Sequence, residues 1–178
     1  MSQDSEPWVA TLSDLKNRPE DSTMEKVFEI YIKTTPERLW AAITDPGERA
    51  SYSFGVEVRS DWSPGSAYKG IPAGATTPML AGKNLDVDPP HRLVQSFNAL
   101  WSDDVRAEGT SRVTWEIEQV EDSCRLMVIH DQLRVGAHGE LYGGWPMILS
   151  GLKTLLETGQ TLTTPGSLRY VGAGAWGE

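Results

Sequence analysis

Clustered cysteines and long apolar runs are both missing from this sequence. Its one cysteine, Cys124, excludes a disulfide within the chain and every metal motif built from paired cysteines. No run reaches the roughly 18 apolar residues that a membrane-spanning helix needs. The polar, acidic start MSQDSEPW lacks the layout of a secretory signal. We therefore expect a soluble, cytoplasmic protein.

Positive charge is scarce as well. The chain has 16 Lys and Arg against 25 Asp and Glu, which gives a formal net charge of −9. Its basic residues are scattered singly, whereas binding to nucleic acid or to an anionic membrane surface needs clusters of Lys and Arg. We therefore expect neither nucleic acid nor a membrane as a partner.

Familiar catalytic motifs are also absent. The sequence contains no GxSxG, no HExxH, no P-loop and no dinucleotide-binding fingerprint. Conventional hydrolase, kinase and oxidoreductase chemistry thus has no support, and we expect no cofactor. Cys124 lies in DSCRLMVI, a segment typical of a strand rather than of an activated thiol. No catalytic residue is assigned, and whether the protein is an enzyme stays open, with a non-catalytic role favoured.

Three residues late in the chain could together ligate a metal ion, namely His130, His138 and Glu140. They fall on a strand end and the following loop, without the helical or paired-cysteine spacing that fixes metal ligands. A ring satisfied by water or backbone is the simpler interpretation of His130. We therefore expect no metal site.

A C-terminal helix is the clearest element that the sequence does contain, in the segment YGGWPMILSGLKTLLETG, residues 142–159. Gly144 suits its N-cap, Pro146 its first turn and Gly159 the position just past its end. Apolar residues recur with a period of about 3.6 and form one stripe that must be buried. The stripe consists of Trp145, Ile148, Leu149, Leu152, Leu155 and Leu156.

The preceding chain predicts one strand, two short helices and then about six strands. Alternating apolar residues mark the first strand in residues 25–33, and Pro36 begins a helix that Asp45 and Pro46 break. From Val56 onwards, extended runs are separated by turns rich in Gly and Pro. This order favours an α+β fold, in which the C-terminal helix covers a six- to seven-stranded antiparallel sheet.

Several segments of the chain, taken together, resemble a known family. They are TTPERLWAAITDPGERASY, DWSPGSAYKG, LDVDPPHRLVQSF, SRVTWEIEQV with CRLMVIHDQL, and GGWPMILSGLKTLLETG. Their order and spacing resemble the START-like or SRPBCC superfamily and, within it, the C-terminal domain of the activator of heat-shock protein 90 ATPase. The resemblance implies a helix-grip fold, whose curved sheet wraps the C-terminal helix and leaves an apolar cavity. It brings no universal catalytic motif.

Three parts of the chain are expected on this basis. Residues 1–24 form an N-terminal extension with a short amphipathic helix, residues 25–159 the START-like domain, and residues 160–178 a tail. The tail and the loop of residues 70–79 exceed the family pattern. Their roles stay open: a lid over the cavity, the arm of a homodimer, or an unstructured tail.

Strand alternation and position on the helix select the candidate cavity wall. In TSRVTWEIEQV, Trp115 belongs to the apolar phase, and the alternate residues fit a solvated face. This polar phase consists of Arg112, Thr114, Glu116 and Glu118. Trp145 begins the helix near the cavity mouth, where an indole could contact a ligand or close the sheet. The expected wall residues are Phe97, Trp115, His130, Trp145, Leu149 and Leu152.

Three functions remain open at this point. The leading hypothesis is binding of a small hydrophobic or amphipathic ligand between sheet and helix. The resemblance suggests a second, a co-chaperone-like module that binds protein, which the absence of the activators' additional N-terminal domain disfavours. The third is a cyclase- or dehydratase-type enzyme in the same cavity, for which only His130, Asp131 and Gln95 could supply acid–base groups.

Overall fold

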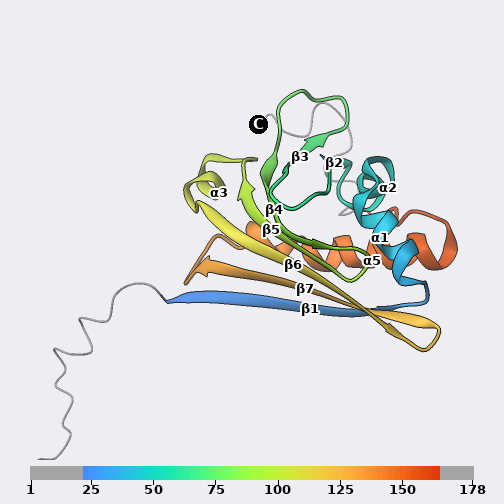
Figure 1. Cartoon of the computed structure of the whole chain (residues 1–178). Coiled ribbons are helices and arrows are strands. Elements are labelled where there is room, and N and C mark those ends of the chain that lie inside the picture. Colours follow the sequence, from blue (N-terminus) through green and yellow to red (C-terminus); the bar gives the residue numbers. More distant parts are fainter. Residues whose placement is uncertain (1–21, 165–178) are drawn as a thin grey trace, which may run out of the picture.

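A seven-stranded antiparallel sheet with a long helix across one face forms the framework of the computed structural model, which describes residues 22–164 (Figure 1). The strands are β1 (Thr23–Ile32), β2 (Val56–Ser60), β3 (Ala67–Pro72), β4 (Leu80–Asp88), β5 (Arg92–Ala99), β6 (Thr110–Val120) and β7 (Ser123–Arg134). The helices are α1 (Pro36–Thr44), α2 (Pro46–Tyr52), α3 (Asp103–Ala107), α4 (Glu140–Gly143) and α5 (Trp145–Thr158). The expected N-terminal helix and most of the tail lie outside the described residues.

The strand order is β1-β7-β6-β5-β4-β3-β2, so the first and last strands of the chain are neighbours. Strands β2 to β7 follow one another as a meander, and every pair is antiparallel. Helix α5 crosses the face that the curved sheet turns inward (Figure 1). This is the predicted α+β helix-grip fold, and it is confirmed.

Helices α1 and α2 are set by two capped starts, as the prolines predicted. The Thr35 hydroxyl accepts a hydrogen bond from Arg38 N at 3.2 Å, and Pro36 opens α1. The Asp45 carboxylate accepts one from Glu48 N at 2.8 Å, and α2 then begins at Pro46. Because each side chain satisfies an N–H that the first turn leaves free, each helix has a defined start.

Helix α5 has the predicted ends and buries the predicted face. It begins after Gly144 and ends at Gly159, whose φ of 73° is the left-handed conformation that glycine adopts most easily. Gly151 lies on its buried face, and a Cβ there would be 3.1 Å from the Cβ of Tyr52. The lack of a side chain at this position therefore lets α5 pack closely against α2.

The main core lies between the concave face of the sheet and α5. Trp115 on β6 is 1% exposed, and Leu149 and Leu152 on α5 pack in the same apolar cluster. Trp40 of α1 packs against that cluster as a half-buried side chain. No helix in the described part of the chain is long and apolar enough to span a membrane.

Two short helices and one residue differ from the sequence analysis. Helices α3 and α4 have five and four residues, too few to show an apolar period. Thr114 was placed on a solvated face but is buried. The prediction was wrong there because Thr114 sits on an inner strand of the sheet, flanked by the apolar residues Val94 of β5 and Ile129 of β7 rather than by solvent.

Candidate functional site

A cavity of ≈ 420 Å³ opens beside α5, where its first turns face the end of α2 and strands β2, β4 and β5. Most of its wall is apolar, and its size falls within the range typical of small-molecule sites. The lining residues are Arg49, Ser53, Phe54, Val56, Met79, Leu80, Phe97, Trp101, Gly139, Glu140, Leu141, Gly143, Gly144, Trp145, Met147 and Ile148.

Two of the six expected wall residues, Phe97 and Trp145, line this cavity. The others lie outside the lining, in the packed layer behind it. Trp115 faces inward, as the strand phase predicted, and its ring packs edge-on against Trp145 with centroids 5.3 Å apart. Leu149 and Leu152 belong to the main apolar cluster between sheet and helix. The open volume lies beside this packed core, toward α4 and the end of α2.

His130 on β7 is the most enclosed polar side chain of this region, at 0% exposure. Its Nε2 lies 2.7 Å from Ser111 Oγ, and its Nδ1 lies 3.2 Å from Trp145 Nε1. An indole N–H can only donate, so Nδ1 must accept, and in the neutral ring the proton resides on Nε2. Nε2 therefore donates to Ser111. Burial lowers the pKa of His130 to about 4, so the ring is neutral near pH 7.

This pair of Ser111 and His130 has the distance of a nucleophile and its base but the wrong tautomer. A general base needs an unprotonated Nε2 facing the hydroxyl, normally with a carboxylate on Nδ1–H. Here the Trp145 indole occupies Nδ1 as a donor. The pair consequently has a structural role: its hydrogen bonds join β6 and β7 to the start of α5.

The other two acid–base candidates are also engaged elsewhere. Asp131 projects from the opposite face of β7 to His130 and accepts a hydrogen bond from Arg112 Nε at 2.8 Å. Gln95 is buried and donates from Nε2 to Asn84 Oδ1 at 2.9 Å. None of the three nominated groups lines the cavity, so the cyclase-type hypothesis gains no geometric support from them.

The three metal candidates do not form a site among the described residues. His130 is enclosed in the core, while His138 and Glu140 are engaged in hydrogen bonds. His138 Nδ1 faces Glu140 N at 3.4 Å, and Glu140 accepts from the Trp101 indole at 3.1 Å. Within residues 22–164 no three acidic, His or Cys side chains gather as metal ligands would.

Cys124 is buried, and this burial raises the pKa of its thiol. The thiol donates a hydrogen bond to Thr34 O at 3.3 Å.

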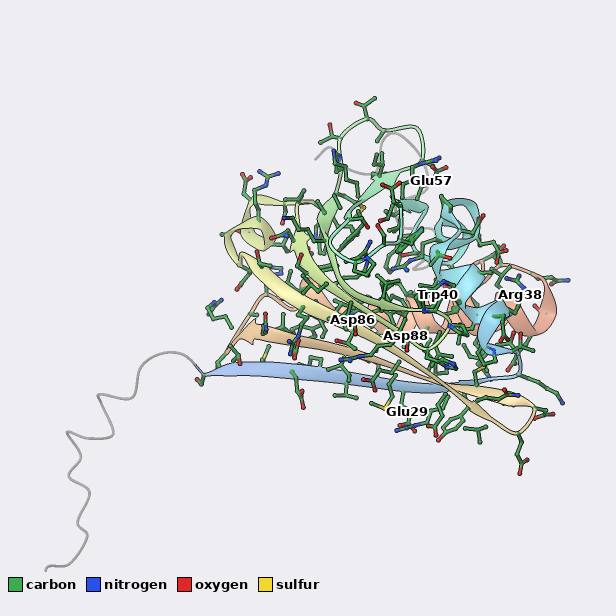
Figure 2. All side chains as sticks on the ribbon, in the orientation of Figure 1. Glu29, Arg38, Trp40, Glu57, Asp86 and Asp88 are labelled. Atoms are coloured by element: carbon green, nitrogen blue, oxygen red, sulfur yellow. The ribbon has the colours of Figure 1, made fainter. Side chains whose placement is uncertain are left out.

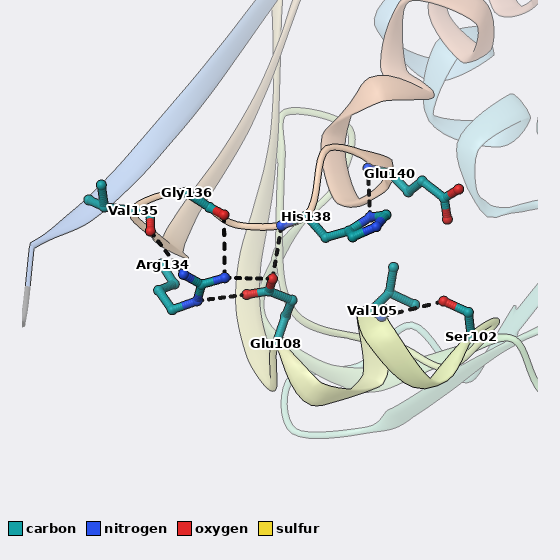
Figure 3. A network of polar contacts seen from close by, with 8 residues as sticks. All are labelled: Ser102, Val105, Glu108, Arg134, Val135, Gly136, His138 and Glu140. Atoms are coloured by element: carbon teal, nitrogen blue, oxygen red, sulfur yellow. Dashed lines mark hydrogen bonds and ion pairs between the residues drawn. The ribbon is translucent and has the colours of Figure 1, made fainter.

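A polar network holds the loop that leads from β7 into α4 and so fixes one wall of the cavity (Figure 3). Glu108 accepts from Arg134 Nη2 at 2.8 Å and from His138 N at 2.9 Å. The Arg134 guanidinium lowers the pKa of Glu108. The loop is thereby tied to the turn before β6, on the side of the cavity where Trp101 and Glu140 meet.

Arg49 is a cavity residue that the sequence analysis missed. It lies on α2, is 7% exposed, and its Nε has no hydrogen-bond partner in the part of the chain that the structure describes. By contrast, Arg38 of α1, which Figure 2 labels, is exposed. It pairs with Glu48 at 2.7 Å. The sequence did carry a weak signal, since Arg49 and Tyr52 are three residues apart on a helix and therefore share a face.

Comparison with known proteins places the chain among proteins of the same architecture. The family model described as "Activator of Hsp90 ATPase homolog 1-like protein" matches residues 33–157. Among curated protein sequences, none matches significantly.

Solved structures share the fold at low sequence identity. CalU16 from Micromonospora echinospora has a TM-score of 0.62 and 20% identity, over 80% of this chain and 82% of its own. PFC0360w, an HSP90 activator from Plasmodium falciparum, has a TM-score of 0.62 and 20% identity, over 75% and 96%. Protein MLL2253 from Mesorhizobium loti has a TM-score of 0.62 and 22% identity, over 77% and 99%. At these identities the likeness is one of fold.

Proposed function

Because this chain belongs to the family of Activator of Hsp90 ATPase homolog 1-like proteins, within the START-like or SRPBCC superfamily, we propose that it binds a small hydrophobic or amphipathic ligand beside α5. The observation that carries the proposal is the ≈ 420 Å³ cavity with its largely apolar wall. Concave apolar sites with a few placed polar groups are the usual form of small-molecule sites.

Phe97 and Trp145 are the wall residues that we propose contact the ligand. Their rings belong to one aromatic chain, since Phe97 and His130 pack edge-on with centroids 5.0 Å apart and His130 bonds Trp145. Trp115, Leu149 and Leu152 support that chain from the core side. A rigid backing of this kind keeps the cavity shape constant, which reduces the entropy lost on binding.

A protein-binding, co-chaperone-like role is the alternative, and it draws on the family description alone. No surface of the described residues specifically favours protein binding over ligand binding. A protein-binding role would also leave the cavity without a use. Ligand binding is therefore the function that the geometry supports better.

The test is a titration with N-phenylnaphthylamine, a neutral dye whose emission rises in apolar surroundings. Ile148 is half-buried and lines the cavity, so Ile148→Trp would fill part of the volume with an indole. We expect the affinity for the dye to fall about tenfold or more, equivalent to about 1.4 kcal/mol. Leu155→Trp is the matched control, because Leu155 lies two turns further along α5, half-buried and outside the lining.

Circular dichroism would establish that both variants fold. The proposal predicts that the wild type and Leu155→Trp bind the dye alike and that Ile148→Trp binds it weakly. Equal binding by all three proteins, or no binding by the wild type, would contradict it.

A further inference from the structure

We infer that the ligand carries one negative charge, a carboxylate, and that Arg49 binds it at the wall of the cavity. The inference rests on the proposed function and specifies the chemical class of ligand at the same site. It starts from a buried charge that has no counterion among the described residues.

Arg49 belongs to none of the ion pairs among residues 22–164. Its neighbour Glu48 on α2 pairs with Arg38 instead. A guanidinium stays protonated in proteins, so Arg49 is a cation in a nine-tenths buried position. Burying a charge is costly unless it is paired and hydrogen-bonded. A structural role alone would thus leave this cation without a paired anion among these residues.

The protein does hold the Arg49 side chain in place. Its Nη1 donates to Ile43 O at 3.4 Å, near the C-terminus of α1, and its Cζ lies 4.7 Å from the centre of the Trp115 ring. Both contacts favour a cation, through the helix dipole and the aromatic face. However, the hydrogen bond is long, and among residues 22–164 Nε has no acceptor. These contacts orient the guanidinium but leave the hydrogen-bonding capacity of Nε unused.

A carboxylate fits that unused capacity better than a neutral polar group. The planar guanidinium presents paired N–H donors that match a carboxylate, and charge-assisted hydrogen bonds are about twice as strong as neutral ones. The apolar lining around Arg49, which includes Val56, Leu80 and Phe97, would then surround the hydrocarbon part of the ligand. The expected class is therefore a monocarboxylic acid with an apolar body.

The second charged residue of the lining argues against a more highly charged ligand. Glu140 is exposed, and its carboxylate accepts the Trp101 indole N–H at 3.1 Å. The lining contains one cation, Arg49, and one anion, Glu140. A doubly charged phosphate bound to Arg49 would therefore keep a negative charge that no second cation of the wall balances. A single carboxylate at Arg49 satisfies the buried cation without a further counterion.

The experiment compares decanoate with decanol, which share one chain and differ in charge, as competitors that displace N-phenylnaphthylamine at pH 7. For the wild type we expect decanoate to compete at least tenfold more strongly than decanol. In Arg49→Met, which removes the charge and keeps an unbranched side chain, this ratio should fall to about one. Arg49→Lys should retain part of the preference, because it keeps the charge but loses the paired donors.

Arg59→Met is the matched control. Arg59 lies on β2, is exposed and pairs with Glu57, so its loss removes the same charge from the protein outside the cavity. This variant should keep the wild-type ratio.

The possible failures can be told apart. If the dye binds the wild type but decanoate has no advantage over decanol, the carboxylate assignment is overturned while apolar binding stands. The same holds if Arg49→Met keeps the full preference, or if Arg59→Met loses it. If the dye itself does not bind, the proposed function fails and the carboxylate assignment fails with it.

Discussion

His130 shows how one hydrogen-bond donor decides the chemistry of a side chain. With a carboxylate at Nδ1, the same ring and the same Ser111 contact of 2.7 Å would form a nucleophile and its base. With the Trp145 indole there, the ring is fixed as a neutral donor to serine. Strand alternation predicts that either His130 or Asp131 points inward, but it carries no information about which distant residue meets the ring.

The buried state of His130 predicts a pH dependence of stability. Its pKa is about 4 in the folded protein and about 6.5 in an unfolded chain. Between these values the unfolded state binds the proton more readily, so the free energy of unfolding falls as the pH is lowered from 6.5 toward 4. The loss amounts to about 3 kcal/mol at 1.36 kcal/mol per pKa unit.

Urea unfolding of the wild type and of His130→Gln at several pH values checks this prediction. The glutamine keeps polar atoms in the site but does not titrate, so the variant should lose less stability over this range. Carboxylates with lowered pKa values, such as Glu29 and Glu108, titrate equally in both proteins. Parallel curves for the two proteins would contradict the assignment.

Arg49 marks the limit of sequence reasoning at the scale of single residues. A charged side chain on a short helix is normally exposed, and the helix of seven residues is too short to show a clear apolar face. Its burial depends on α5 lying across α2, where Gly151 allows close approach to Tyr52. That contact joins residues almost a hundred positions apart, so no local pattern could reveal it.

Among the elements, the boundary between α1 and α2 depends on Asp45. Its side chain caps α2 through Glu48 N, and its own backbone N–H donates to Ala41 O at 2.8 Å, which closes α1. The following Pro46 cannot donate a hydrogen bond and so suits the first position of α2. One dipeptide thus ends one helix and begins the next, and α2 in turn places Arg49 in the cavity wall.

Asp45→Ala should lower the free energy of unfolding by about 1 kcal/mol, the usual cost of losing an N-cap. Asp45→Asn should have a much smaller effect, because the amide oxygen can accept the same hydrogen bond. Thermal or urea unfolding of the three proteins measures the difference. Equal destabilisation by both variants would show that the negative charge matters rather than the cap.

The elements also differ in how far the sequence predicts them. Helix α5 could be predicted with both ends, because its apolar stripe and its flanking glycines act together over 14 residues. Helices α3 and α4 could not, since each is about one turn long and too short to show an apolar period. Ser102 caps α3 locally, with its Oγ accepting from Val105 N at 3.4 Å, whereas the tertiary contacts of the Glu108 network hold the loop before α4.

For the whole molecule, the order of elements predicted an antiparallel sheet covered by α5, and the family resemblance implied the helix-grip fold. Neither predicted the position of the cavity. The strand phase of Trp115 and the buried face of α5 were correct. The open volume, however, is what remains after α5, α4 and the end of α2 have packed against the sheet. Such a remainder depends on the three-dimensional packing of many side chains. Of the residues that line the cavity, Phe97 and Trp145 were expected there from the sequence, whereas Arg49 and Trp101 were not.

The most direct test of the central claim uses the tryptophan indole N–H signals of the protein in an NMR titration with N-phenylnaphthylamine. Trp101 and Trp145 line the cavity, whereas Trp40 and Trp62 lie outside its lining. Binding at the proposed site should shift the signals of Trp101 and Trp145 in a saturable manner and leave those of Trp40 and Trp62 nearly unchanged. Shifts confined to Trp40 and Trp62, or no saturable shift at all, would contradict ligand binding in this cavity.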